Sequence, residues 1–353
     1  MPHDADVLAA LGEFNLEPVT VEPILMGNIN RTFRVTSGAG VFTLQVLNPI
    51  FSPKVNEDIE AVTAHLAARG MVTPRLVRTT KGMLWTTDGK GQVWRLLTHV
   101  DGTVLSSGTT SGHCRRAGEL LGQFHVAVSD LEYSFCNVRT GVHDTKRHRR
   151  HLQEVMQSHK QHTAFYQVAA VGEEILARIG QLPALGELPQ RIVHGDPKIN
   201  NVVFSPTGAA ICLIDLDTLA KMSIPVELGD AFRSWCNPVG EDGSDPWFDL
   251  ERFVAGLEGY AQGAKGLLTA QEWAGTSFMV ETITLELAAR FCTDALEESY
   301  FGWNKEVFSS ASAHNLHRAK IQLGLARSVG SQRVEIADAV RGVANRLRYW
   351  PVG

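Results

Sequence analysis

The stretch 193–204 constrains the fold of this chain more than any other part of the sequence. It reads VHGDPKINNVVF, so that an apolar strand begins directly after Asn201, with Asp196 a short way before it. A turn at 205–208 and a second apolar run follow, and that run ends at Asp215. If the two runs pair as a hairpin, Asn201 and Asp215 lie at the same end of a small sheet.

These residue types suit phosphoryl transfer. Asp196 can accept or orient the proton of an attacking hydroxyl, and Lys198 is near enough in sequence to reach the transferred group. Asn201 and Asp215 offer the hard oxygen ligands that Mg²⁺ prefers. Each piece alone has a plain structural explanation, such as a capped turn or a chance carboxylate after a strand. The combined pattern predicts an ATP- and Mg²⁺-dependent kinase.

The composition excludes several other classes. With 353 residues, 44% hydrophobic and 20% charged, the chain is long enough for two lobes around a cleft. A net charge of -5 gives no basic field for nucleic acid.

The five cysteines include no CxxC pair, and no apolar run approaches the roughly 20 residues that span a bilayer. The start of the chain lacks a basic signal-peptide region. We expect a cytoplasmic protein with reduced thiols, acting on a small molecule without nucleic acid or membrane, as a monomer or homodimer.

The first hundred residues predict a β-rich lobe with one inserted helix. The helix is expected over 55–69, because Val55, Ile59, Val62 and Leu66 share one face, and Gly70 would end it. The expected strands are 19–25, 32–36, 41–47, 75–78 and 93–100.

The rest of the chain predicts a larger helical lobe. A short β-rich segment is expected over 192–219, and Asp245 before Pro246 indicates a helix start. Gly118 and Gly122 would allow one helix to approach a neighbour closely. The expected helices are 112–128, 146–159, 164–179, 246–261, 270–296, 311–328 and 334–347. The fold class is therefore α+β and bilobal, with an N-terminal lobe over 1–100 and a C-terminal lobe over 101–353.

At this point the chain resembles the aminoglycoside phosphotransferase and choline kinase superfamily, whose fold is protein-kinase-like. The signature is His194-x-Asp196 followed by Asn201 and the Ile214–Asp215 strand end, with Gly229-Asp230 downstream. Within the superfamily the nearest resemblance is to the N-acetylhexosamine 1-kinases. The segments that carry it are 27–33, 44–45, 143–145, 196–201, 214–218, 229–233, 286–291, 300–301 and 314–316.

The resemblance implies roles for particular residues around ATP and Mg²⁺. Asp196 becomes the catalytic base, and Asn201 and Asp215 become the metal ligands. The turn 27–30 would cover the phosphates, and 97–100 would be the hinge that binds adenine. The residues implied on the nucleotide side are Gly27, Asn28, Asn30, Gln45, Glu60, Leu97 and His99. Those implied on the sugar side are Asp144, Asp217, Arg290 and Tyr300.

Two features depart from the kinase pattern. The third strand usually presents a lysine that pairs with a helix glutamate, and here it offers Gln45 opposite the candidate Glu60. Lys198 or the metal would then have to supply the missing charge. Gly27 is also the only glycine of its turn, which could be a plain hairpin turn. A catalytically silent nucleotide-binding module is therefore an alternative.

The acceptor is less well defined than the donor side. Glu286 and Arg290 could simply be a helix-stabilising pair, and Tyr300 could be a core aromatic. The acids over 241–251 would suit a polycationic drug, although a solvated loop explains them equally well. The sequence favours phosphorylation of the anomeric hydroxyl of an N-acetylhexosamine or related hexose. The alternative acceptor is an aminoglycoside or an amino alcohol.

Overall fold

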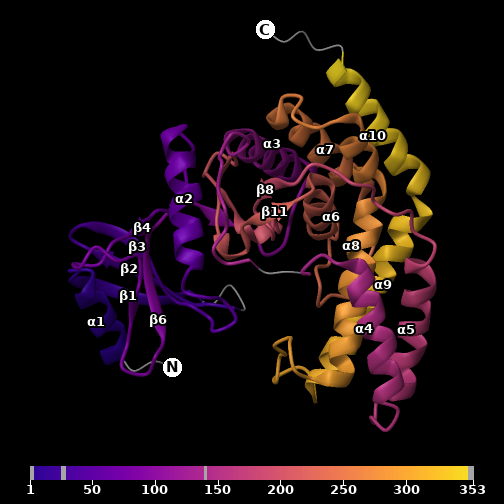
Figure 1. Cartoon of the computed structure of the whole chain (residues 1–353), viewed down its shortest axis with the longest axis horizontal. Coiled ribbons are helices and arrows are strands. Elements are labelled where there is room, and N and C mark those ends of the chain that lie inside the picture. The colour runs from indigo at the N-terminus through magenta and orange to yellow at the C-terminus, as the bar shows by residue number, and fades with distance from the viewer. Residues whose placement is uncertain (1–3, 25–28, 139–140, 349–353) are drawn as a thin grey trace.

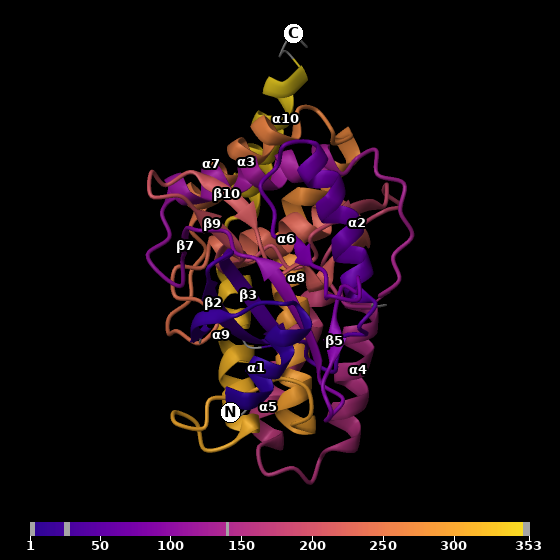
Figure 2. The ribbon, with the colours of Figure 1, turned by 90° about the vertical axis from the view of Figure 1, so that its left-hand side faces the viewer.

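The computed structural model describes residues 4–24, 29–138 and 141–348. A small sheet with helices α1 and α2 lies to one side of a larger helical body in Figure 1. Turned by 90°, the same sheet lies in front of the helical body (Figure 2). The α+β, bilobal fold class predicted from the sequence is confirmed. The division at residue 100 stays a prediction.

The small lobe is an antiparallel meander extended by later strands. Its sheet runs in the order β1–β2–β3–β6–β4, with β5 also paired to β6. Val35, Leu44, Trp94 and Leu96 form its core, on which Leu11 of α1 packs. Its elements are α1 (Asp4–Glu13), β1 (Pro18–Ile24), β2 (Arg31–Ser37), β3 (Gly40–Val46), α2 (Val55–Ala68), β4 (Leu76–Val77), β5 (Thr86–Thr87) and β6 (Val93–Thr98).

Helix α2 ends as the sequence predicts. Gly70 has φ +75°, a left-handed conformation that glycine adopts at low cost. Val55, Ile59 and Val62, which share one helix face, are buried against the larger lobe's core. The helix therefore connects the small sheet to the helical body.

The larger lobe holds a short hairpin within its helices. Strands β9 and β10 pair antiparallel, β7 adds to β9, and β8 pairs with β11. Its elements are β7 (Thr103–Val104), α3 (Ser111–Ala127), α4 (Thr145–Ser158), α5 (Phe165–Ile179), β8 (Arg191–Val193), β9 (Val202–Phe204), β10 (Ala210–Leu213), β11 (Ala220–Met222), α6 (Ile224–Trp235), α7 (Leu250–Ala264), α8 (Ala270–Glu297), α9 (Ala311–Ser331) and α10 (Arg333–Arg348), with single 3-10 turns η1 (Ile199–Asn201) and η2 (Leu216–Thr218).

Helices α3 and α7 approach each other through glycines on both sides. A Cβ on Gly118 would lie 2.1 Å from Gly256 O, and one on Gly122 would lie 2.5 Å from Ala264 N. Such distances leave no room for a side chain, so the predicted close packing of this helix is confirmed.

Two details of the helical lobe differ from expectation. Helix α7 begins at Leu250, because Asp249 accepts the Arg252 N–H at its start, and Asp245 is not the cap. Helix α6 was not predicted, and its charged residues Glu227, Asp230 and Arg233 are buried together with its apolar ones. Among the described residues no helix is long and apolar enough to cross a bilayer.

Candidate active site

The β9–β10 hairpin brings together the residues of the central motif. The backbone N–H of Ile214 donates to Asn201 O at 2.9 Å, which joins the two chain segments just beyond the paired strands. The Nδ2 of Asn201 donates to Asp196 O at 2.8 Å. That bond orients the amide so that its oxygen remains the available acceptor. Asp196, Asn201 and Asp215 thus meet at one end of the hairpin.

The loop before the hairpin is held by its own histidine and glycine. His194 Nε2 lies 2.9 Å from Ile214 O, while Nδ1 accepts the Asp196 N–H at 3.3 Å. Since a carbonyl only accepts, Nε2 carries the proton. Gly195 has φ +84°, and a Cβ there would lie 2.1 Å from Thr218 O. The His-Gly-Asp sequence is therefore a requirement of this turn as well as of its chemistry.

Two side chains of helix α6 hold the loop that carries Asp196. The buried carboxylate of Glu227 accepts the Gly195 N–H at 2.8 Å and contacts His125, whose other ring nitrogen lies 2.8 Å from Tyr260 Oη. Trp235 Nε1 donates to Pro197 O at 2.8 Å. These supports were not predicted, since they come from helices distant in sequence. The catalytic loop is consequently anchored on both sides.

Asp196 and Lys198 form an ion pair at the front of the loop. Lys198 Nζ lies 3.1 Å from Asp196 Oδ2, and both side chains are partly exposed. The Asp196 carboxylate raises the pKa of Lys198, with smaller contributions from Glu241 and Asp230. Lys198 is therefore a cation at neutral pH, placed beside the predicted base.

Asp215 has the environment expected of a cation ligand. It adopts a left-handed φ of 63° and lines the cleft cavity. The depth of the cleft, together with repulsion from Asp217 and Asp196, raises its pKa to about 7. A divalent cation would relieve that repulsion, and the Asn201 oxygen is the neighbouring hard ligand. The residues present therefore fit a magnesium site. The site would use one carboxylate and one amide oxygen, and the described residues contain no cluster of three or more His, Cys, Asp or Glu that could hold a metal.

The cavity beside these residues has a volume of about 350 Å³ and lies between the small sheet and the hairpin. Strand and hinge residues, among them Thr43, Gln45, Leu97 and Val100, line one side. The His99 N–H already donates to Val41 O at 3.2 Å, so that amide is not free for adenine. Burial and the nearby Arg34 lower the pKa of the His99 imidazole, which is therefore neutral.

The pairing of Gln45 with Glu60 that the kinase pattern implies is not formed. Glu60 does not meet Gln45; its carboxylate lies 3.4 Å from Arg75 and 3.2 Å from Arg78. Gln45 instead accepts from Arg95, because the two residues are directly opposite in the β3–β6 register. Arg95 was missed, although it is the only charged residue of its strand.

The turn before β2 falls partly outside the described residues. Gly27 and Asn28, predicted to cover the phosphates, belong to that part. Asn30 lines the cavity and donates through Nδ2 to Asp217 Oδ2 at 2.5 Å. Asp217 therefore lies beside Asn30, and because both of its carboxylate oxygens are bonded to protein it is not in a position to hold a sugar.

A second group of polar residues joins the segment at the start of α4 to α8. His143 Nδ1 lies 3.0 Å from Glu286 Oε1, and Thr145 Oγ1 donates to Glu286 at 2.6 Å. Although burial opposes it, the hydrogen bond to Glu286 raises the pKa of His143, with Asp230 adding to the effect. Glu286 is thus engaged by His143, and not by Arg290 as in the alternative helix pair.

Asp230 connects this group to the catalytic loop. Although burial opposes it, Arg233, His143 and Lys198 together hold the pKa of Asp230 below its ordinary value. Asp230 is therefore close enough to both Lys198 and His143 to feel their charges.

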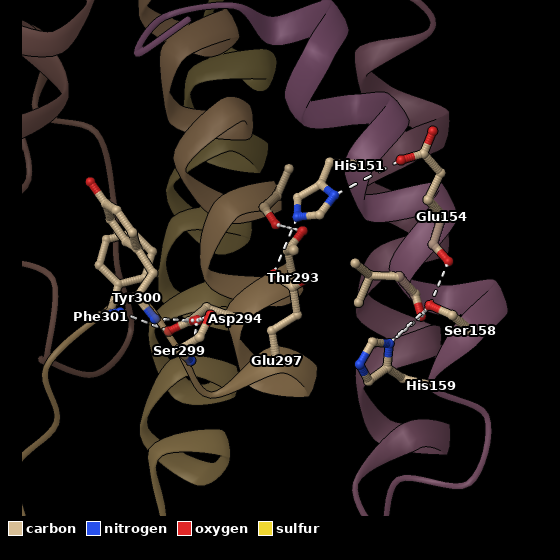
Figure 3. A network of polar contacts seen from close by, with 12 residues as sticks. His151, Glu154, Ser158, His159, Thr293, Asp294, Glu297, Ser299, Tyr300 and Phe301 are labelled. Carbon is tan, nitrogen blue, oxygen red and sulfur yellow. Dashed lines mark hydrogen bonds and ion pairs between the residues drawn. The ribbon is translucent and has the colours of Figure 1, made fainter. Parts of the chain in front are cut away.

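Arg290 on α8 lies over an aromatic pair in the loop after that helix. The Arg290 guanidinium lies 5.7 Å from the Tyr300 ring centroid and 5.5 Å from that of Phe301. Asp294 positions these aromatics, because its carboxylate accepts the backbone N–H groups of both, each at 2.8 Å (Figure 3). By contrast Asp144 caps α4 through the Arg147 N–H at 2.9 Å and is exposed, which gives it a structural role.

Four of the five acids over 241–251 have partners within the protein, and the exposed Asp245 is the fifth. Glu241 lies 2.9 Å from Arg233, and Asp242 lies 2.9 Å from His314 and 2.6 Å from Arg318. Asp249 caps α7, and Glu251 accepts from Ser111 at 2.9 Å. This segment therefore offers little uncompensated negative charge to a polycation.

Comparison with known proteins agrees with this geometry. The model of the phosphotransferase enzyme family matches residues 20–265, more than half of the chain. The chain belongs to that family. It is an ATP-dependent kinase that acts on an alcohol group, as the sequence predicts.

Solved structures share the fold at low sequence identity. An amicoumacin kinase in complex with AMP-PNP and Ca²⁺ has a TM-score of 0.64 at 14% identity, covering 91% of this chain and 93% of its own. A microcompartment-associated aminopropanol kinase has a TM-score of 0.61 at 15% identity, covering 94% and 98%. An aminoglycoside phosphotransferase from Alicyclobacillus acidocaldarius has a TM-score of 0.59 at 14% identity, covering 97% and 96%.

Proposed function

We propose that the protein transfers the γ-phosphoryl group of ATP to a hydroxyl of a sugar, preferably the anomeric hydroxyl of an N-acetylhexosamine or a related hexose. The observation that carries this proposal is the composition of the acceptor side. Arg290 stacks on Tyr300 and Phe301, while the nearby acids are bonded to protein cations. Guanidinium groups and aromatic faces suit the hydroxyls, carbonyl and ring of a neutral sugar.

The catalytic loop would orient the acceptor. Asp196 accepts the proton of the attacking hydroxyl and holds its oxygen in line with the γ-phosphorus. Lys198, cationic beside Asp196, lies where it can neutralise charge on the transferred group. Asn201 and Asp215 would hold Mg²⁺, which supplies charge neutralisation at the phosphates when bound. The catalytically silent module is disfavoured, because it has no need for a base and two metal ligands at one hairpin end.

A panel of acceptors tests the proposal. Purified protein is offered ATP and Mg²⁺ with N-acetylhexosamines, plain hexoses, choline, aminopropanol and aminoglycosides, and ADP release is followed. We expect turnover with a hexose and little with the cationic compounds. Turnover of an aminoglycoside or amino alcohol, with none of any sugar, would overturn the sugar assignment. The Asp196→Asn variant supplies the blank for ATP hydrolysis without transfer.

A further inference from the structure

A buried ion pair joins the small sheet to the metal end of the hairpin. Arg95 on β6 donates through Nη1 and Nη2 to the two oxygens of Asp217, at 2.5 and 2.9 Å. The two side chains are 2% and 1% exposed. Asp217 belongs to η2, the turn that begins directly after Asp215. The pair therefore fixes the position of the candidate metal ligand relative to the sheet.

The remaining donors of Arg95 are also used. Its Nε and Nη2 donate to Gln45 Oε1 at 2.9 and 2.7 Å, and Nη1 donates to Asn56 Oδ1 on α2 at 3.3 Å. Because all the N–H groups of a guanidinium are then directed at protein oxygens, Arg95 has none left for a phosphate. Its influence on a nucleotide must pass through the residues that it holds.

Gln45 is the residue through which that influence passes. Its oxygen is held by Arg95, so its Nε2 end is turned the other way, where it donates to Thr32 Oγ1 at 3.2 Å. Gln45 and Thr32 both line the cavity. An amide nitrogen carries two hydrogens, and the second remains for an oxygen in the cavity.

The same ion pair also holds the turn before β2. Asn30 Nδ2 donates to Asp217 Oδ2 at 2.5 Å, while its Oδ1 accepts the Asn48 N–H at 2.9 Å. One carboxylate thus connects β6, this turn and the end of the hairpin. All three surround the cavity in which Asp215 and Gln45 lie.

We propose that Arg95 and Asp217 are a positioning pair that replaces the strand-lysine and helix-glutamate pair of other kinases. They orient the Gln45 amide as a donor to a nucleotide phosphate, and they hold Asp215 against the same cavity. The inference rests on the proposed use of ATP and adds the residues that make a glutamine sufficient on β3. Arg95 and Asp217 touch neither substrate nor metal and act through Gln45 and Asp215.

A purely structural role makes a different prediction. Removing one partner of a buried ion pair leaves an uncompensated charge, and such a variant would fail for reasons unrelated to ATP. Replacing both partners by apolar residues of similar size is often neutral for stability. The double variant therefore separates folding from nucleotide positioning.

The test measures the melting temperature and the Kd for ATP with Mg²⁺ by titration calorimetry, which requires no acceptor. The variants are Arg95→Met with Asp217→Leu, Gln45→Met and Arg95→Lys. The control is Arg341→Met with Asp338→Leu, which removes an exposed pair on α10. We expect the double variant to melt near the wild type and Gln45→Met to melt lower, because the buried Arg95 Nε loses its acceptor. Both should bind ATP roughly tenfold or more weakly, as expected for loss of a hydrogen bond to a charged group. Arg95→Lys should lie between them and the wild type, and the control should not change.

An unchanged Kd in Gln45→Met, or in a folded double variant, would overturn the proposal. If the double variant does not fold, Gln45→Met and Arg95→Lys decide alone. In both of these variants a cation remains beside Asp217, so no buried charge is left unpaired. A wild-type protein that binds ATP but phosphorylates no tested acceptor would refute the proposed function and leave this test intact.

Discussion

The phosphate side and the acceptor side of this cleft are built in different ways. On the phosphate side, Asp196, Asn201 and Asp215 come from one loop and one hairpin, and neighbouring backbone groups hold them. On the proposed acceptor side, the polar groups come from the segment before α4, from α8 and from the loop after it: His143, Glu286, Arg290 and Tyr300. The comparison indicates that the reacting groups of the phosphate side come from one continuous segment and are supported by distant helices, whereas the groups proposed for the acceptor are themselves brought together only by helix packing.

The largest effect is expected at the predicted base. Asp196→Asn keeps the size of the side chain but cannot accept the hydroxyl proton, so kcat should fall by about 10²- to 10⁴-fold. The melting temperature should stay near that of the wild type. Asp338→Asn is the matched control, since Asp338 is an exposed carboxylate on α10. Comparable turnover by Asp196→Asn would remove this residue from the base role.

The second effect tests whether local geometry holds the phosphate side together. Gly195→Ala places a Cβ 2.1 Å from Thr218 O at a φ of +84° and should destabilise the protein by more than about 1 kcal/mol. Gly38→Ala is the control, because a Cβ there would have no atom within 4 Å and its φ is not in the left-handed region. Chemical denaturation measures both variants. Equal stability would show that the loop tolerates other conformations.

The third effect isolates the acceptor side. Arg290→Met and Tyr300→Ala should each raise the KM for the sugar roughly tenfold, as expected for lost contacts worth about 1.4 kcal/mol, and leave the KM for ATP unchanged. Arg149→Met, an exposed cation on α4, serves as the control. A change in the KM for ATP alone would place these residues on the wrong side of the cleft.

The smallest effect is a pH dependence at His143. Its pKa is raised by Glu286, so the stability from this pair is complete below the unfolded histidine pKa of about 6.5 and is lost as pH rises through the higher folded pKa. Melting temperatures between pH 6 and 9 should fall more for the wild type than for His143→Gln. Parallel profiles would show that the histidine carries no charge in the folded protein.

The same contrast explains what the sequence could predict. The meander, α2 with Gly70 at its end, and the Asn201–Asp215 hairpin follow from local patterns of polarity and turn residues. The Arg95–Asp217 pair was missed because its partners are distant in sequence and only tertiary packing brings them together. The partner of Glu60 was predicted wrongly for the same reason. Helix periodicity predicts which face of α2 the residue lies on, but its partners are the nearby Arg75 and Arg78.

The most direct test of the account follows the phosphorus itself. The protein is incubated with ATP, Mg²⁺ and an N-acetylhexosamine, and ³¹P NMR records the products of the wild type and of Asp196→Asn. The account predicts a sugar phosphate coupled to the anomeric proton, formed at the rate of ADP release and absent from the variant. Inorganic phosphate as the only new signal, or equal product from Asp196→Asn, would contradict it.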